Sequence, residues 1–201
     1  MKSKTILALT VLISLCTFAW PQTAPPRIGV RPEPAEGKGV VVLRAARLID
    51  GTGAAPITNA VVIVTDNTIT AVGDARSVRT PSGAKVIDLG DVTLLPGFID
   101  AHTHLIGRVL GDPEADGSSV RDYDAFTAIL GVLHARDTLM AGFTSVRNVG
   151  AGGPFNDMAL RKAINEGWTP GPRMETAGHA IGITGGHCDD NGYKPGILQG
   201  G

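Results

Sequence analysis

LLPGFIDAHTHL, residues 94–105, is the stretch of the sequence that says most about its fold. A Pro-Gly break leads into a run, 98–105, that is apolar enough to form a strand buried on both faces. Side chains two residues apart on a strand point the same way, so Asp100, His102 and His104 are predicted to share one face. The opposite face would carry Ile99, Ala101 and Thr103.

Two imidazoles on one strand face can supply two ligands of a metal site. Each neutral ring offers one nitrogen, and zinc binds such donors at about 2.0 to 2.1 Å. Asp100 could accept the far N–H of a histidine and fix its tautomer. The spacing is weak evidence by itself, because a His-x-His pair on a strand is also typical of two ordinary polar residues.

The composition predicts a folded globular chain. Of 201 residues, 43% are hydrophobic, which suits a packed core and excludes a largely disordered protein. The formal net charge is −1 with no basic run outside the N-terminus, so the chain lacks the positive surface of a nucleic-acid-binding protein. Cys16 falls in the leader described next, which leaves Cys188 alone and excludes a disulfide framework in the mature chain.

Residues 1–19 have the order of a secretory signal peptide. Two lysines precede an apolar run at 6–18, and the Thr-Phe-Ala triplet ending at Ala19 places small residues where a signal peptidase reads them. An uncleaved membrane anchor is the alternative, but the run is shorter than the roughly 20 residues that a spanning helix needs. A lipidated Cys16 is disfavoured because a leucine precedes it. The proline-rich residues 20–38 are predicted to form an extended linker.

Residues 39–96 are predicted to form the N-terminal part of a small β-sandwich domain. Short β-branched and apolar runs recur without a helical period, and glycines and prolines separate them. Asp66-Asn67 tolerates positive φ and stands between the runs 61–64 and 68–72, which predicts a tight hairpin. Further strands are expected at 40–43, 85–89 and 92–95.

Strands and helices are predicted to alternate in residues 97–201. After the His-x-His strand we expect a long loop at 107–122, a helix at 122–141, a strand at 143–149, a helix at 156–166 and a strand at 174–181. This order favours an α/β fold made of parallel βαβ units, here the first three strands of a (β/α)8 TIM-type barrel. A complete barrel takes about 250 residues, so we expect the barrel to be incomplete in this chain.

The predicted helix at 122–141 has a stripe of apolar residues that we expect to cover the core. The stripe consists of Phe126, Ile129, Leu130, Leu133 and Met140. His134 lies beside this stripe and is expected to be a helix-surface histidine rather than a ligand.

Four strings then identify a family resemblance: PGFIDAHTH at 96–104, GFTSVR at 142–147, GPR at 171–173 and TGGH at 184–187. Together they resemble the imidazolonepropionase and Xaa-Pro dipeptidase branch of the metal-dependent amidohydrolase superfamily. The resemblance implies that His102 and His104 bind one or two divalent metal ions, with zinc expected, and that Asp100 supports them as an outer contact. The catalytic residues and the remaining ligands, namely a carboxylated lysine, two further histidines and an aspartate, would come from later strands beyond Gly201.

Two further residues are candidates for substrate binding. His187 follows two glycines whose N–H groups could meet a substrate carboxylate, although a solvent-facing loop histidine is the alternative. Arg147 could bind a carboxylate through a bidentate fork, or it could anchor a barrel layer by an ion pair. Asn148 and Cys188 depart from the pattern, because this branch often has Asp and Gly there.

The chain is therefore expected to be the N-terminal portion of an exported, periplasmic or extracellular hydrolase. The resemblance implies hydrolysis of amide or peptide C–N bonds in Xaa-Pro dipeptides or N-acyl amino acids by metal-activated water. The 201-residue chain alone is expected to be inactive. The alternative is a truncated, non-catalytic exported module that binds a metal or ligand. A small amide or dipeptide is the expected partner, with no nucleic acid and no stable membrane insertion, and a homo-oligomer is compatible with the sequence.

The leader generates a first prediction. We expect the mature protein to begin near Trp20, because the small residues ending at Ala19 complete the signal-peptidase pattern. Amino-terminal sequencing of the protein recovered from outside the cytoplasm tests this. Recovery of cytoplasmic protein that still begins at Met1 would contradict it.

Overall fold

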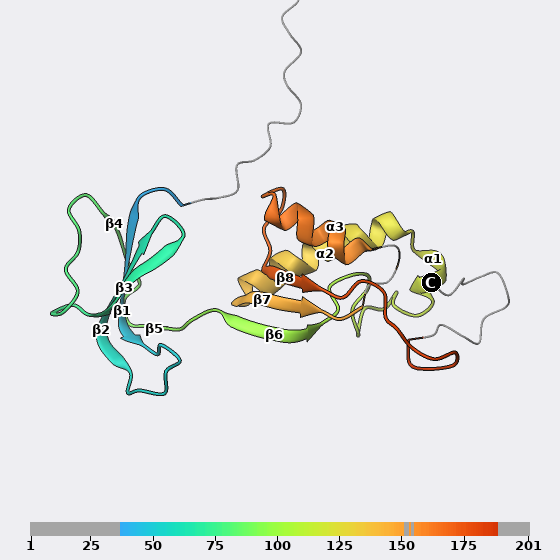
Figure 1. Cartoon of the computed structure of the whole chain (residues 1–201), viewed down its shortest axis with the longest axis horizontal. Coiled ribbons are helices and arrows are strands. Elements are labelled where there is room, and N and C mark those ends of the chain that lie inside the picture. Colours follow the sequence, from blue (N-terminus) through green and yellow to red (C-terminus); the bar gives the residue numbers. More distant parts are fainter. Residues whose placement is uncertain (1–36, 151–152, 154, 189–201) are drawn as a thin grey trace, which may run out of the picture. The chain divides into compact units, whose positions relative to one another are not determined.

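The computed structural model describes residues 37–150, 153 and 155–188. The predicted signal peptide at 1–19 and nearly all of the predicted linker at 20–38 lie outside the described residues. The described strands form two separate sheets, one built from residues 40–94 and the other from residues 98–176 (Figure 1).

The first sheet has five strands. They are β1 (Val40–Leu48), β2 (Ile57–Thr65), β3 (Thr68–Asp74), β4 (Lys85–Asp88) and β5 (Thr93–Leu94). The order is β3-β2-β1-β4, with β5 also pairing with β1. β2 is antiparallel to β1 and β3, whereas β4 and β5 run parallel to β1.

Two apolar clusters cover this sheet. One contains Val42, Val61 and Ile63, and the other contains Leu48, Ala60 and Val62. The members of β2 alternate between the two clusters, which explains why its continuous apolar run is buried on both faces. The strands agree with the sequence prediction. The grouping of residues 39–96 into a β-sandwich domain remains a prediction.

The predicted hairpin is confirmed. Asp66 adopts φ 55 between β2 and β3, which are antiparallel neighbours. Its carboxylate also accepts a hydrogen bond from the Gly39 N–H at 2.8 Å, so the turn is tied to the start of β1.

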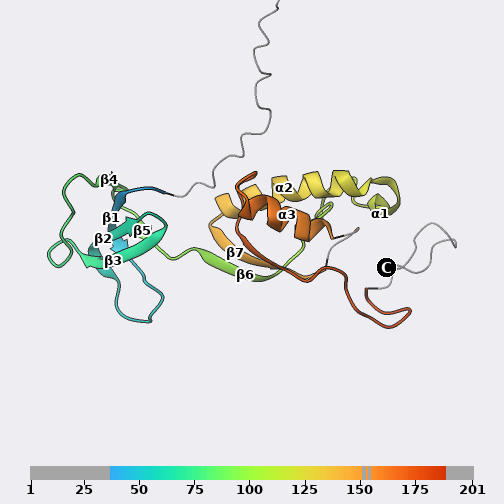
Figure 2. The ribbon, with the colours of Figure 1, turned by 45° about the horizontal axis from the view of Figure 1, so that its top comes forward.

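The second sheet is parallel and has two helices on one side. Its strands β6 (Phe98–Thr103), β7 (Phe143–Asn148) and β8 (Arg173–Thr176) lie in the order β6-β7-β8. The helices are α1 (Ser118–Arg121), α2 (Asp124–Met140) and α3 (Asn156–Asn165). Figures 1 and 2 show α2 and α3 on the same side of the sheet. The mixed α/β fold with βαβ units is therefore confirmed. Two details differ from the prediction: the last strand ends at Thr176 rather than at residue 181, and the predicted loop at 107–122 contains the short helix α1.

The Pro-Gly break explains how β6 begins beside β7. A Cβ atom on Gly97 would lie 2.2 Å from the Thr144 side chain, so only glycine allows this approach. The next residue, Phe98, donates its N–H to the Gly142 carbonyl at 2.9 Å. Any side chain at position 97 would push the two strands apart.

The core beneath the helices differs from the prediction. It is formed by Leu105, Ala135, Val146, Leu160 and Met174. In α2 the buried residues are Gly131 and Ala135, whereas Ile129 is 65% and Met140 75% exposed. The predicted stripe was wrong because small residues let α2 approach the sheet closely: a Cβ on Gly131 would lie 2.7 Å from the Ile106 side chain.

The prediction that 98–105 is buried on both faces was also wrong for most of its length. Phe98 is 52% and Ile99 76% exposed, and only Leu105 in this run is buried. The reason is that β6 is an edge strand of the described sheet, and that α2 and α3 lie on only one side of that sheet (Figures 1 and 2). No helix among the described residues has the length and apolar character needed to cross a membrane.

Candidate metal centre

The histidine pair has a geometry that fits a shared ion. The ring centres of His102 and His104 lie 5.3 Å apart, with their planes inclined by 70°, and both side chains are exposed. Two imidazoles that bind one tetrahedral ion through nitrogens at about 2.0 to 2.1 Å have ring centres about 5 Å apart. His102 lies in β6 and His104 directly follows its last residue, so the pair can supply two neighbouring ligands at the carboxyl end of this strand.

A third ligand does not join this pair in the part of the chain that the structure describes. Across those residues no group of three or more histidine, cysteine or carboxylate side chains is placed to hold an ion. Catalytic zinc sites usually have three protein ligands. His102 and His104 thus fit a metal as part of a ligand set, and zinc itself remains a prediction.

Asp100 makes a different contact from the expected one. Its Oδ1 accepts a hydrogen bond from the backbone N–H of His102 at 3.0 Å. The pairing of β6 with β7 is irregular between Asp100 and Thr103, so counting by two does not carry the face of the histidines back to Asp100. The carboxylate fixes the backbone of a candidate ligand, and a contact with an imidazole N–H stays a prediction.

The residues on either side of His104 are held by their neighbours. Thr103 donates its hydroxyl to the Arg147 carbonyl at 3.0 Å and accepts the Val149 N–H at 3.0 Å through its own carbonyl. Leu105 donates its N–H to Asn148 Oδ1 at 2.7 Å.

Two residues in this region were not recognised as part of the site from the sequence. Asn148 was noted only as a departure, yet it is fully buried. His134, expected on the helix surface, is half-buried, and its Nδ1 lies 2.9 Å from the Leu105 carbonyl oxygen. The sequence feature that could have identified Asn148 is its position at the carboxyl end of a predicted parallel strand, where functional side chains are often found in barrel enzymes.

The two predicted substrate-binding residues are exposed. Arg147 lies on β7, and His187 lies in the segment after β8. Neither side chain has a hydrogen bond or ion pair with His102 or His104 in the described structure. Their roles at a substrate carboxylate therefore remain predictions. Cys188 is a free, exposed cysteine.

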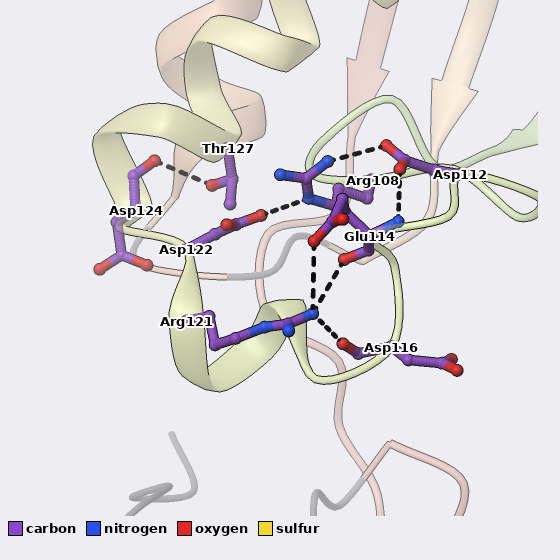
Figure 3. Close-up of polar contacts among 8 residues, drawn as sticks. All are labelled: Arg108, Asp112, Glu114, Asp116, Arg121, Asp122, Asp124 and Thr127. Carbon is purple, nitrogen blue, oxygen red and sulfur yellow. Dashed lines mark hydrogen bonds and ion pairs between the residues drawn. The ribbon is translucent and has the colours of Figure 1, made fainter.

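A network around Arg108 organises the loop that follows the histidines (Figure 3). Arg108 donates through Nε to Asp122 at 2.7 Å and through Nη1 to Asp112 at 3.0 Å. Its guanidinium carbon lies 5.5 Å from the centre of the Phe126 ring, so it also packs on α2. Bonds to Asp122 and then Asp112 raise the pKa of Arg108 above its ordinary value.

The same loop is closed on itself by backbone and side-chain bonds. The Glu114 N–H donates to Asp112 Oδ1 at 2.8 Å. This bond, with a further contribution from Arg108, lowers the pKa of Asp112. Figure 3 shows the guanidinium of Arg121 reaching the backbone carbonyls of Glu114 and Asp116. The loop that follows β6 and the histidines in the chain is thus held in a defined conformation.

Comparison with known proteins identifies the family. The model of the amidohydrolase family matches residues 93–196, the part that contains the histidine pair and the parallel sheet. The chain belongs to the amidohydrolase family. This result confirms the resemblance found in the sequence, and the family is generally metal-dependent.

Three amidohydrolase relatives show the range of similarity. Ochratoxinase of Aspergillus niger is 30% identical over 163 residues, which are 75% of this chain and 30% of ochratoxinase. A solved Xaa-Pro dipeptidase with methionine bound in its active site has a TM-score of 0.66 at 31% identity, covering 78% of this chain and 38% of that protein. A prolidase complexed with N-methylphosphonate-L-proline has a TM-score of 0.63 at 29% identity, with 78% and 37% covered. This amidohydrolase chain therefore spans about a third of their length.

The Arg108 network generates a second prediction. Replacing Arg108 with Met should raise the pKa of the Asp112 carboxyl, because a hydrogen bond and an attractive charge are removed. The pKa of Asp112 is lowered in the folded state. Its stabilising effect is therefore present above the unfolded-state pKa and lost as pH falls through the folded-state pKa.

Carboxyl-carbon NMR titration measures this change directly. Asp50 is the matched control, since its pKa is lowered by Thr52 rather than by an arginine, and it should not change in Arg108→Met. An Asp112 pKa that is the same with and without Arg108 would contradict the network.

Proposed function

We propose that the protein containing this chain hydrolyses amide or peptide C–N bonds in small molecules, with Xaa-Pro dipeptides or N-acyl amino acids as substrates. The observation that carries the proposal is the His102–His104 pair, whose ring centres lie 5.3 Å apart at the carboxyl end of β6 in the amidohydrolase region. Relatives named as a Xaa-Pro dipeptidase and as a prolidase support the substrate class.

In this proposal His102 and His104 hold one or two divalent ions, with zinc expected. A bound ion of this kind lowers the pKa of water to about 7 and polarises a carbonyl oxygen. Asp100 keeps the His102 backbone in place through its bond to the N–H. The loop held by Arg108 follows the pair directly in the chain.

The two exposed candidates would act on the substrate rather than on the ion. Arg147 is positively charged and exposed on β7, the strand next to the histidines, so its planar fork is available to a substrate carboxylate. His187 is exposed in the segment after β8, so its imidazole is available to a substrate carboxylate. A free α-carboxylate is common to both proposed substrate types.

We also propose that the protein works outside the cytoplasm. The support is the order of lysines, apolar run and small residues in 1–19, followed by the proline-rich segment 20–38. A leader of this kind would deliver the hydrolase to extracellular or periplasmic amides.

A third prediction tests the proposed function. His102→Ala and His104→Ala, each made in the protein that contains this chain, should lose at least one bound metal ion. Their activity should also fall by more than the roughly 10- to 100-fold that is typical when a residue that holds a metal ligand, rather than the metal itself, is replaced. Asp100→Asn should be milder, because an amide oxygen can still accept the His102 N–H. Metal content by plasma spectrometry and hydrolysis of Xaa-Pro and N-acyl amino-acid substrates are the measurements.

His179→Ala is the matched control. This histidine is also exposed, but it follows β8 and its ring packs on Phe155 at 4.6 Å. It should keep both metal and activity. If the His102 and His104 variants keep their metal and rate while His179→Ala loses them, the metal site has been assigned to the wrong strand.

A further inference from the structure

We propose that Asn148 and His134 clamp the backbone of Leu105 and thereby position the His104 ring for metal binding. This assignment rests on the proposed function, because it gives both residues a role at the same metal site. The three residues come from different elements: Asn148 ends β7, His134 lies in α2 and Leu105 follows β6. We call them the Leu105 clamp.

The Asn148 side of the clamp requires an amide. Asn148 is fully buried, its Oδ1 accepts the Leu105 N–H at 2.7 Å, and its Nδ2 donates to the Gly150 carbonyl at 3.0 Å. A carboxylate could accept from Leu105 but could not donate to Gly150. The amide at position 148 thus lets one side chain bond two backbone groups of opposite polarity.

The His134 side of the clamp fixes a tautomer. Nδ1 lies 2.9 Å from the Leu105 carbonyl oxygen, which can only accept a hydrogen bond. Nδ1 must therefore carry the proton, and a neutral His134 must be the Nδ1–H form. Both backbone polar groups of Leu105 are then bonded to side chains, which replace the strand pairing that ends at Thr103.

Packing adds a third restraint on Leu105. Its side chain is 6% exposed and lies in the core with Val146 and Leu160. Gly131 lets α2 approach, since a Cβ there would lie 2.7 Å from the Ile106 side chain and 3.2 Å from the Leu160 side chain. The N–H held by Asn148 belongs to the peptide unit that joins His104 to Leu105. Rotation of the His104 backbone is therefore restrained directly.

The positioning role follows from how the two histidines are supported. The His102 N–H is held by Asp100, whereas the backbone after His104 is held by the Leu105 clamp. Groups that orient metal ligands typically contribute 10- to 100-fold to metal affinity. A clamp that served only stability would affect metal binding no more than any other core contact does.

The test is a zinc titration of the protein that contains this chain, followed through the imidazole nitrogen signals of His102 and His104 by NMR. His134→Leu removes the donor and should weaken zinc binding by about 10- to 100-fold. His134→Asn places an N–H donor where Nδ1 stands and should restore binding to near the wild-type value. In wild type, neutral His134 should show the Nδ1–H tautomer.

Met174→Ala is the control for a purely structural role. Met174 is 4% exposed in the same core but lies on β8, so its truncation should lower stability and leave zinc affinity unchanged. Equal zinc affinity in His134→Leu and wild type would overturn the clamp. So would an equal loss of affinity in Met174→Ala and His134→Leu.

A metal-free measurement separates failure of the clamp from failure of the proposed function. Without zinc, wild type and His134→Asn should show a ring-to-ring nuclear Overhauser contact between His102 and His104, which His134→Leu should lose. If wild type shows this clamp-dependent contact but its two rings bind no zinc, the proposed function fails while the positioning by the clamp stands. If wild type binds zinc through both rings and His134→Leu keeps the contact and the affinity, the clamp fails while the proposed function stands.

Discussion

Burial of Leu105 beneath α2 is the constraint on which the parallel sheet and its candidate site depend. Its side chain joins Val146 and Leu160 in the core, and both of its backbone polar groups are bonded to side chains. A buried N–H or carbonyl without a partner is costly, so these bonds and the packing require one another. Because Leu105 directly follows His104, the same contacts that close the core also fix the end of the strand that carries the histidine pair.

The sequence predicted the elements well where local chemistry determines them. Asp66 tolerates positive φ, and the hairpin between β2 and β3 forms there. The alternation of strands and helices after the His-x-His string predicted the parallel order β6-β7-β8. The His-x-His spacing predicted that the two rings lie close together, and their centres are 5.3 Å apart.

The remaining features depend on long-range packing, which periodicity does not report. The large apolar residues of α2 suggested a core-facing stripe, yet Gly131 and Ala135 face the sheet because close approach requires small side chains there. The bond of Asp100 to the His102 N–H was likewise not evident from spacing. Neither the partnership of Asn148 with Leu105 nor that of His134 could be found by spacing, since these pairs are 43 and 29 residues apart.

The central claim is that His102 and His104 bind the same ion in this member of the amidohydrolase family. Anomalous X-ray diffraction at the zinc edge, on zinc-loaded crystals of the protein that contains this chain, tests it most directly. The account predicts an anomalous peak about 2.0 to 2.1 Å from one ring nitrogen of each histidine. A fully occupied zinc peak bound elsewhere, with both rings free of metal, would contradict it.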